Sequence, residues 1–403
     1  MDRGNIVGWA LVAGVAGYIG LEDAPWHVPM PNGLPTVPIW AGLVMLVAFV
    51  WVMVRGRVEP VVVLAAMAIV ASLLFDATFF AGTAFRDLGI YLRAGLQFRL
   101  DQPIYLTGVV SALPTDPTAY PYLYPPPTLP FAAVLSLLPG PIVTVGWELG
   151  LLAATLAGLR LIGLGWRWSI VLLAWPPFAQ GLYVGNIALP LFLIFAAGPW
   201  FGRGLVAGAL LKPQGAIAGL WLVRERRWRE LLVGGAMLAG LLIVTLPLTG
   251  VDRWAAWLEG LSWFSRSQPL VPRTFYGLAL AEYVPGVVAV AAAALVLVLA
   301  LLGRGRPGLG RLGVATVVAS PSLYAHGFSV ALPALLELRA PLLWTAIALT
   351  SVSGGLSWFG AIAIVVAGWF VPILRRPGPA DPLHPLAGAA SPWPALPPER
   401  GQG

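Results

Sequence analysis

Long apolar runs, separated by short segments that carry arginine, dominate the chain. A membrane-spanning helix needs ~20 consecutive apolar residues, and inside lipid only helices and closed barrels satisfy every backbone hydrogen bond. The alternation expected of a membrane barrel is absent from the sequence. The pattern therefore predicts an all-α polytopic membrane protein of about 11–13 transmembrane helices, with no soluble domain. The runs are 5–21, 37–54, 60–82, 141–163, 168–183, 187–201, 204–223, 230–249, 284–303, 311–337, 341–356 and 358–374.

The arginines between these runs orient the predicted helices, because cytoplasmic loops of membrane proteins are enriched in Lys and Arg. Two long segments, 83–123 and 250–283, then become outer loops. The Pro-bounded stretch 127–138 is predicted to lie along the outer surface or to dip shallowly, since a crossing there would reverse the later loops. The basic loops assigned to the cytoplasm are Arg55/Arg57, Arg160/Arg167, Arg224–Arg229, Arg304–Arg311 and Arg375/Arg376.

The runs divide the chain into three regions. Residues 1–58 are predicted to hold two accessory transmembrane helices, the first of which is retained because it lacks a convincing small-x-small cleavage site. Residues 59–376 form the main membrane domain. Residues 377–403 are rich in Pro, Gly and Ala, which predicts a disordered cytoplasmic tail. We find no internal repeat in the sequence, which weakens the case for an inverted-repeat transporter.

Two of the runs are predicted to break at a proline. The run 204–223 must leave and return on the same side of the membrane, yet it is only one span long, so we expect two half-helices broken at Lys212-Pro213. The same reasoning breaks 311–337 at Ser320-Pro321. Broken helices at membrane depth are tolerated only where they line protein or a water-filled cavity, so these breaks predict such a cavity.

The second outer loop contains the amphipathic segment RWAAWLEGLSWFSR. Trp254, Trp257, Leu261 and Phe264 share one face at helical spacing. We therefore expect a helix that lies in the membrane interface.

The composition agrees with a membrane protein. Hydrophobic residues make up 59% of the chain, charged residues 10%, and the mean hydropathy is +0.84. The net charge of +7 comes from arginines dispersed among short loops, which argues against nucleic-acid binding. The chain has no cysteine, which excludes disulfides and thiolate metal sites. Its single lysine, Lys212, lies in an apolar segment.

An ionisable side chain at mid-membrane costs ~2.5–3.5 kcal/mol on insertion scales, so those within the apolar runs need a reason. They are Asp76, Glu148, Lys212 and His326. Asp76 suits either a second acid at a cavity or a structural partner for Arg86. Glu148 suits a hydrogen bond to a neighbouring helix or to water. His326 follows a helix break and is either a satisfied polar residue or functional, and no second histidine lies near enough to suggest a metal pair.

Asp87 lies in the segment RDLGIYLRAG, with Leu88, Tyr91 and Leu92 at helical spacing behind it. An aspartate before the first apolar residue is typical of a helix N-cap. It is also placed as a general base just outside the hydrocarbon, at the start of a rigid helix, and one residue can do both.

The order of several motifs points to a known family. They are the outer-loop DLGIYLRAG and PIY, followed by YLYPPPTLPFAAVLSLLPG, AQGLYVGNIALPLFL, AGALLKPQGAIAGLWLVRERRWRE and SPSLYAHGFSVALPAL. From about residue 60 to 375 the chain resembles glycosyltransferase family 87, the polyprenol-phosphate-mannose-dependent mannosyltransferases of the GT-C membrane fold. Soluble nucleotide-binding and serine-hydrolase motifs are absent from suitable contexts, so an activated substrate should arrive through the membrane.

The resemblance implies an inverting transfer of a sugar, mannose, from a polyprenyl-phosphate carrier to a lipid or glycan acceptor on the outer face of the cytoplasmic membrane. Asp87 matches the catalytic aspartate of the first outer loop. Lys212 and His326 match donor-phosphate positions. No cofactor is firmly implied besides the donor, no metal ligands are assigned, and a role for a divalent ion stays open. The cavity or acceptor candidates are Asp76, Arg86, Tyr91, Tyr124, Gly185 and Asn186.

Two other classes of function compete with this one. A transporter or flippase of a lipid-linked or small solute would use Asp76, Lys212 and His326 as a relay or binding site. A structural assembly partner has less support, because helix breaks and a buried lysine are costly for scaffolding. The sequence also departs from the family in its extra N-terminal helices and in the third proline of the Tyr-Pro-Pro segment.

Overall fold

A computed structural model describes residues 84–111, 120–267, 279–351 and 355–375. In these ranges the chain is helical, with an isolated antiparallel bridge between Leu338 and Arg375. The all-α prediction is confirmed for this part of the chain. The predictions about the N-terminal helices, Asp76 and the tail 377–403 lie outside the described residues.

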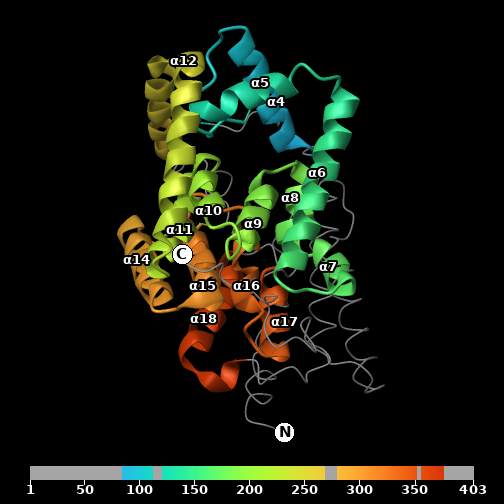
Figure 1. Ribbon diagram of the computed structural model, residues 1–403, viewed down its shortest axis with the longest axis vertical. Coiled ribbons are helices and arrows are strands. Elements are labelled where there is room, and N and C mark those ends of the chain that lie inside the picture. The colour runs from blue at the N-terminus through green and yellow to red at the C-terminus, as the bar shows by residue number, and fades with distance from the viewer. Residues whose placement is uncertain (1–83, 112–119, 268–278, 352–354, 376–403) are drawn as a thin grey trace, which may run out of the picture.

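The first half of the described chain places one short helical pair above a set of broken helices. α4 and α5 lie at one end of the molecule, with α12 along one side and α6 along the other (Figure 1). The elements are α4 (Arg86–Arg99), η4 (Pro126–Thr128), α5 (Leu129–Leu135), α6 (Gly140–Leu161), α7 (Trp166–Leu173), α8 (Pro176–Val184), α9 (Ala188–Ala197), α10 (Arg203–Ala207), η5 (Gly208–Leu210), η6 (Pro213–Gly215), α11 (Ala216–Arg224) and α12 (Trp228–Ser267).

The second half forms the opposite end of the molecule (Figure 1). Its elements are η7 (Leu280–Glu282), α14 (Gly286–Leu301), α15 (Gly305–Val318), η8 (Ala325–Ala331), α16 (Leu332–Leu335), α17 (Ala340–Leu349), α18 (Gly355–Phe370) and η9 (Pro372–Leu374).

Two of the described helices, α6 and α12, are long and apolar enough to cross a membrane. Both expose large apolar side chains, such as Ile142 and Leu149 on α6 and Leu232 and Ile243 on α12. Exposed apolar flanks of this kind need a covering of lipid or protein. The other apolar helices among the described residues have at most 17 residues, so the larger number of spans stays a prediction.

The run 168–183 was predicted as one continuous helix, and that prediction is wrong. It forms two helices, α7 and α8, with Trp175 in an extended conformation between them. Pro176 and Pro177 follow directly. A proline disfavours the helical conformation in the residue before it and lacks an N–H, so the helix restarts with both prolines in its first turn.

Both predicted proline breaks are confirmed. α10 and η5 end at Leu210, and η6 restarts the chain at Pro213. α15 ends at Val318, and η8 begins only at Ala325. Each break therefore leaves a non-helical segment with polar backbone groups inside the helical assembly, next to the cavity described below.

The stretch 127–138 forms the short helix α5, which packs on α4. Gly95 of α4 allows the close approach, since a Cβ atom there would lie 2.1 Å from the carbonyl oxygen of Ala132. The seven residues of α5 span about 10 Å at 1.5 Å per residue. That length is too short to cross the ~30 Å hydrocarbon layer, which agrees with the prediction that this stretch does not cross.

The sequence predicts that the amphipathic segment after residue 250 lies in the membrane interface, but part of its aromatic face packs on protein. α12 is interrupted by a kink at Gly250, whose φ of 70° and ψ of 158° are not helical, and a second helical part runs as far as Ser267. Trp257 then donates its indole N–H to the carbonyl oxygen of Leu123, at 3.0 Å, and Phe264 is buried. Packing against the 120–124 segment outweighs the interfacial preference of this face.

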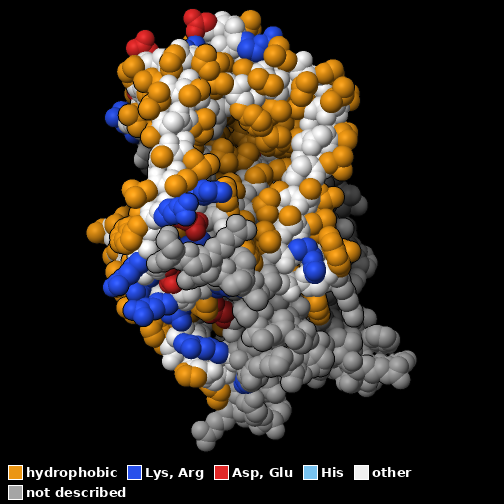
Figure 2. Space-filling view, in the orientation of Figure 1, with side chains coloured by type: hydrophobic (Ala, Val, Ile, Leu, Met, Phe, Trp, Pro, Cys, Tyr) orange, Lys and Arg blue, Asp and Glu red, His pale blue; other side chains and the backbone are white. Residues whose placement is uncertain are grey.

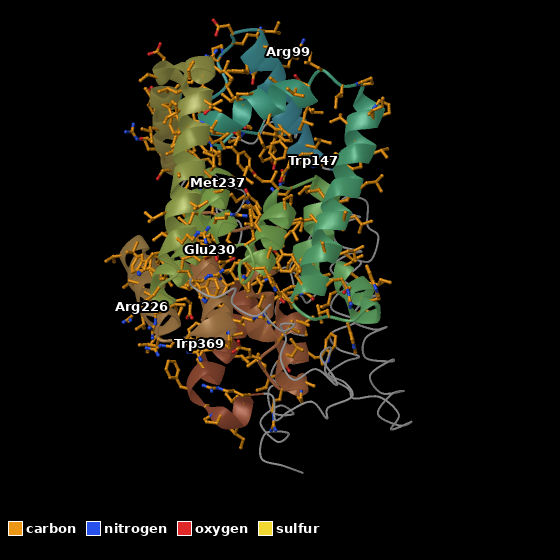
Figure 3. All side chains as sticks on the ribbon, in the orientation of Figure 1. Arg99, Trp147, Arg226, Glu230, Met237 and Trp369 are labelled. Atoms are coloured by element: carbon orange, nitrogen blue, oxygen red, sulfur yellow. The ribbon has the colours of Figure 1, made fainter. Side chains whose placement is uncertain are left out.

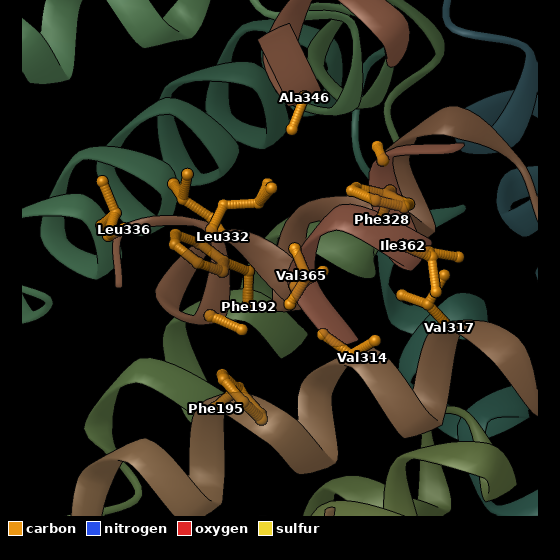
Figure 4. Close-up of a cluster of buried hydrophobic side chains, with 14 of the residues drawn as sticks. Phe192, Phe195, Val314, Val317, Phe328, Leu332, Leu336, Ala346, Ile362 and Val365 are labelled. Atoms are coloured by element: carbon orange, nitrogen blue, oxygen red, sulfur yellow. The ribbon is translucent and has the colours of Figure 1, made fainter. Parts of the chain in front are cut away.

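The largest hydrophobic core lies at the end away from α4 and α5, where α15 to α18 meet α8 and α9 (Figures 1 and 4). Phe328 is buried in it and makes edge-to-face contacts with Trp175 and Trp358, at centroid distances of 6.1 and 5.1 Å. Such pairs stabilise beyond the area that they bury. They fix η8, and with it the neighbouring His326.

Candidate active site

The site begins where α4 starts. Phe85 precedes the helix in a left-handed conformation (φ 56°) and donates its backbone N–H to the carbonyl oxygen of Tyr183, at 2.8 Å. The helix itself begins at Arg86, so Asp87 lies in its first turn and makes no N-cap hydrogen bond. The capping interpretation of Asp87 is therefore wrong, and its carboxylate is free to serve other partners.

The Asp87 carboxylate is buried and accepts hydrogen bonds on both oxygens. Arg86 donates from Nε to Oδ1 at 2.8 Å, and Asn186 donates from Nδ2 to Oδ2. Because an aspartate that accepts on both oxygens from N–H groups is held in one orientation, Asp87 presents a fixed carboxylate to the space beside it.

Asn186 joins Asp87 to Lys212. Its Oδ1 accepts a hydrogen bond from the backbone N–H of Ala188 at 2.8 Å and from Lys212 Nζ at 3.5 Å. A backbone N–H can only donate, so it fixes which end of the amide is the oxygen. The Nδ2 group must then face Asp87, and the side chains form a chain from carboxylate through amide to ammonium.

Gly185 allows this turn to form. Its φ is +74°, and a Cβ atom would lie 3.1 Å from the Cβ of Leu88 and 3.4 Å from Nε1 of Trp147. Trp147, which extends from α6 toward α4 (Figure 3), donates its indole N–H to the Gly185 carbonyl at 2.9 Å. A left-handed residue in close contact on two sides favours glycine, so the Gly-Asn pair sets the position of the amide.

Two tyrosines line the wall next to Asp87. Their hydroxyl oxygens, Tyr91 on α4 and Tyr124 before η4, lie 3.0 Å apart, and Tyr91 also accepts from the N–H of Ile187 at 3.5 Å. Burial, and then the nearby Tyr124 and Asp87, raise the pKa of Tyr91 well above its usual value. Tyr91 therefore stays a neutral phenol that donates and accepts hydrogen bonds.

Arg86 is held between the carboxylate and two aromatic rings. Its guanidinium carbon lies 5.4 Å from the ring centre of Tyr120 and 5.7 Å from that of Tyr324. Burial lowers the pKa of Arg86, but the charge of Asp87 and the hydrogen bond to it outweigh that effect, and the pKa is raised. The side chain is thus a permanent cation beside Asp87.

These side chains surround a cavity of about 470 Å³. The space-filling view is hollowed in the same region, below α4 and α5, with hydrophobic walls (Figure 2). Charged and amide groups line one part, and α12 contributes an apolar wall. The lining residues that matter most are Arg86, Asp87, Tyr91, Tyr120, Leu123, Tyr124, Asn186, Lys212, Trp257, Leu261, Phe264, Tyr324 and His326.

His326 is buried at the base of the cavity. Its ring stacks on Tyr324 at a centroid distance of 5.8 Å, and among the described residues its Nδ1 has no hydrogen-bond partner. A second, mostly apolar cavity of about 80 Å³ lies behind it, and Lys212 and His326 line both. These two side chains therefore border both cavities.

The structure brings together most of the residues singled out from the sequence. Gly185 is not part of the cavity lining but directly precedes Asn186, which is. Asp76 lies outside the described residues. Glu148 on α6 is not part of the cavity lining, and its Oε1 finds no partner in the described part of the chain. The candidates that line the cavity are Arg86, Asp87, Tyr91, Tyr124, Asn186, Lys212 and His326.

Sequence reasoning gave no role in the site to Tyr324, Tyr120 or Trp257. Tyr324 stacks on His326 and lies in a non-helical segment, so no periodicity of the sequence points to it. Trp257 does share a helical face, but sequence alone does not tell a membrane-facing aromatic stripe from one that faces a cavity. Across the described ranges no group of three or more His, Asp or Glu side chains could hold a metal ion.

Comparison with known proteins gives a family. Residues 122–321 match the family model for Glycosyltransferase family 87. Over 209 residues the chain is 29% identical to the polyprenol-phosphate-mannose-dependent alpha-(1-2)-phosphatidylinositol pentamannoside mannosyltransferase of Mycolicibacterium smegmatis, covering 47% of this chain and 50% of that protein. The matched region thus spans about half the length of this curated relative. No solved structure matches.

Proposed function

The chain belongs to glycosyltransferase family 87, and we propose that it transfers mannose from a polyprenyl-phosphate carrier to a lipid or glycan acceptor. Family membership supports glycosyltransferase activity, and the name of the mycobacterial relative supports the donor. The observation that carries the proposal is the cavity in which side-chain hydrogen bonds join Asp87 to Asn186 and Asn186 to Lys212.

Asp87 is the proposed general base. The acceptor hydroxyl oxygen attacks C1 of the sugar from the face opposite the phosphate, its proton passes to the Asp87 carboxylate, and the bond from C1 to the phosphate oxygen breaks. The electron pair of that bond leaves with the polyprenyl phosphate. One displacement inverts the configuration at C1. A correctly placed base contributes about 10²–10⁴-fold to such a step.

Lys212 and His326 are the proposed partners of the leaving phosphate. Negative charge grows on that phosphate as the bond breaks, so cations and N–H donors held in a cavity lower the barrier. Lys212 lies at a helix break, where its compact ammonium fits better than a broad guanidinium. The unpartnered Nδ1 of His326 leaves this ring with hydrogen-bonding capacity that a phosphate oxygen can use.

The position of these two residues between the two cavities also fits a lipid-linked donor. A polyprenyl phosphate has a charged head and an apolar tail. The larger cavity has charged and amide groups, from Asp87, Arg86 and Asn186, that suit a sugar and a phosphate, and the smaller one adds apolar side chains such as Leu191, Ile194 and Phe195. We place the phosphate at the junction.

Arg86 and Asn186 are positioning residues in this mechanism. Arg86 keeps positive charge beside the carboxylate, and Asn186 holds its second oxygen while also contacting Lys212. Preorganised groups of this kind reduce the reorganisation needed when the proton moves.

The reaction is placed on the outer face of the cytoplasmic membrane. The support is the sequence topology, in which the basic turns face the cytoplasm and α4 and α5 lie outside. α6 and α12, the two membrane-length helices of the described chain, stand on either side of the cavity end of the molecule (Figure 1).

A transporter or flippase is the competing proposal, because Lys212 and His326 could bind a solute without chemistry. The family match favours the transferase. The test is to incubate purified protein with labelled polyprenyl-phosphate mannose and a lipid extract, and to identify the product. A new mannosylated product supports transfer. If protein reconstituted in vesicles moves the donor across the membrane unchanged and no product forms, the transferase proposal is contradicted.

A further inference from the structure

Two basic turns meet at the end of the molecule opposite α4. The turn between α11 and α12 and the turn between α14 and α15 are tied by three hydrogen bonds. Trp221 Nε1 donates to the Gly305 carbonyl at 2.7 Å, the Gly305 N–H donates to Glu225 at 2.8 Å, and Arg224 Nε donates to the Leu301 carbonyl at 2.8 Å. The two turns therefore form one fixed surface.

This surface carries arginines without counter-charges. Arg226, Arg229 and Arg304 are exposed, and none of them forms an ion pair with another described residue. The nearby acids already have partners, because Glu225 accepts from the Gly305 N–H and Glu230 pairs with Arg227. The positive charge of the three arginines is thus directed to the surroundings.

The backbone supports the outward display of these charges. Arg226 has a φ of +58°, a left-handed conformation that favours glycine. It closes the turn after α11, where its N–H bonds the Val223 carbonyl at 3.2 Å. A long cationic side chain therefore stands on a tight turn, next to Arg229 in the following helix.

Apolar helix flanks start at the same turns. Trp228, at the start of α12, is 52% exposed, and Leu232 one turn later is 72% exposed. Val298 on α14 and Leu302, which caps its C-terminal end, are about equally open, at 59% and 61%. A cationic cluster next to exposed apolar flanks matches a molecule with an anionic head and apolar chains.

The opposite end of the molecule differs in charge. There, exposed Arg99 and Arg266 share the surface with exposed Asp101, Asp252 and Glu259. Arg226 and Arg99 lie in different halves of the molecule in Figure 3, and in Figure 2 basic side chains outnumber acidic ones in the lower half, whereas both kinds appear at the top. The unpaired positive charge of the paired turns therefore favours an anionic ligand there.

We propose that the paired turns bind the phosphate head group of an anionic phospholipid, whose acyl chains lie against α12 and α14. Guanidinium groups bind phosphate oxygens in bidentate geometry. A zwitterionic lipid brings its own cation, which the arginines repel. The site is separate from the cavity and does not depend on the reaction proposed for it.

The test measures lipid binding to the purified full chain in detergent by native mass spectrometry. The probes are dioleoylphosphatidylglycerol and dioleoylphosphatidylcholine at equal concentration. The expected result is preferential retention of dioleoylphosphatidylglycerol by the wild type. Its binding should be at least about tenfold weaker in the Arg226→Gln/Arg229→Gln/Arg304→Gln protein, since each arginine near an anionic head group adds to the attraction.

The matched control is Arg93→Gln/Arg99→Gln/Arg266→Gln, which removes the same charge from the other end and should keep the preference. Equal retention of both lipids by the wild type, or equal losses in the two triple variants, would overturn the proposal. If the Arg226→Gln/Arg229→Gln/Arg304→Gln protein does not fold, the single variant Arg304→Gln decides. Weaker binding of dioleoylphosphatidylglycerol supports the site, and unchanged binding refutes it.

Discussion

Asn186 donates a hydrogen bond from its side-chain Nδ2 to Oδ2 of Asp87, across 99 positions of sequence. The backbone N–H of Ala188 fixes the orientation of the amide, at 2.8 Å from Oδ1. The proposed base and the proposed phosphate ligand therefore share one positioning residue, and changes at Asn186 should affect transfer without direct loss of either group.

Asn186→Asp tests this link. The variant replaces the donor that faces Asp87 with a second carboxylate, so it loses a hydrogen bond to a charged group worth ~1.5–3 kcal/mol and adds repulsion. We expect kcat to fall by at least about tenfold, and by more than in Asn186→Ala, which loses the bond alone. Steady-state kinetics with both variants give the comparison. Wild-type kcat in Asn186→Asp would contradict the positioning role.

Lys212→Ala tests donor binding. If the ammonium contacts the phosphate, KM for polyprenyl-phosphate mannose should rise by at least about tenfold, because charge-assisted hydrogen bonds are the strong ones. The melting temperature should change little. Arg99→Ala, an exposed cation far from the cavity, is the control. A large loss of stability with an unchanged donor KM would favour a structural ion pair instead.

Gly185→Ala should destabilise the protein by ~1–2 kcal/mol, the usual cost of a left-handed conformation for an L-residue. The added methyl would also press on Leu88 and Trp147, the first at 3.1 Å. Thermal unfolding measures the effect. Gly235→Ala is the matched control, since it lies in α12 with open space around it and alanine favours a helix by up to ~1 kcal/mol. Equal melting temperatures would contradict the strain argument.

Tyr91→Phe addresses pH dependence. The pKa of Tyr91 is raised by burial, so the phenol keeps its proton at and below its ordinary pKa and does not titrate between about pH 7 and 9. We expect a loss of ~1 kcal/mol in stability from the missing hydrogen bonds. The shape of the kcat profile over that range should not change. A shift of its alkaline limb in the variant would show that Tyr91 ionises during turnover.

Much of the fold could be predicted from the sequence, because the strongest signals were local. The proline breaks at Lys212-Pro213 and Ser320-Pro321 follow from the missing N–H and the steric effect on the preceding residue. The division of 168–183 into α7 and α8 was missed although Pro176 and Pro177 gave the same signal. The length of the apolar run favoured one helix, and the two prolines, which disfavour it, determine the structure.

The contacts of the site could be predicted only in part. The breaks at Lys212-Pro213 and Ser320-Pro321 predicted a cavity, but hydrogen bonds across long sequence separations leave no local pattern. The face of α12 that bears Trp257 and Phe264 shows the limit. A 3.6-residue period marks an apolar face and does not say whether lipid or protein covers it.

The most direct test is mannose transfer by purified wild-type protein and Asp87→Asn, with labelled polyprenyl-phosphate mannose as donor. Asp101→Asn is the control, because this exposed carboxylate pairs with Arg253 at 2.5 Å, outside the cavity, and exposed pairs contribute little. We predict product from the wild type and Asp101→Asn, and kcat lower by at least about 100-fold in folded Asp87→Asn. Transfer by Asp87→Asn at the wild-type rate would contradict the central claim.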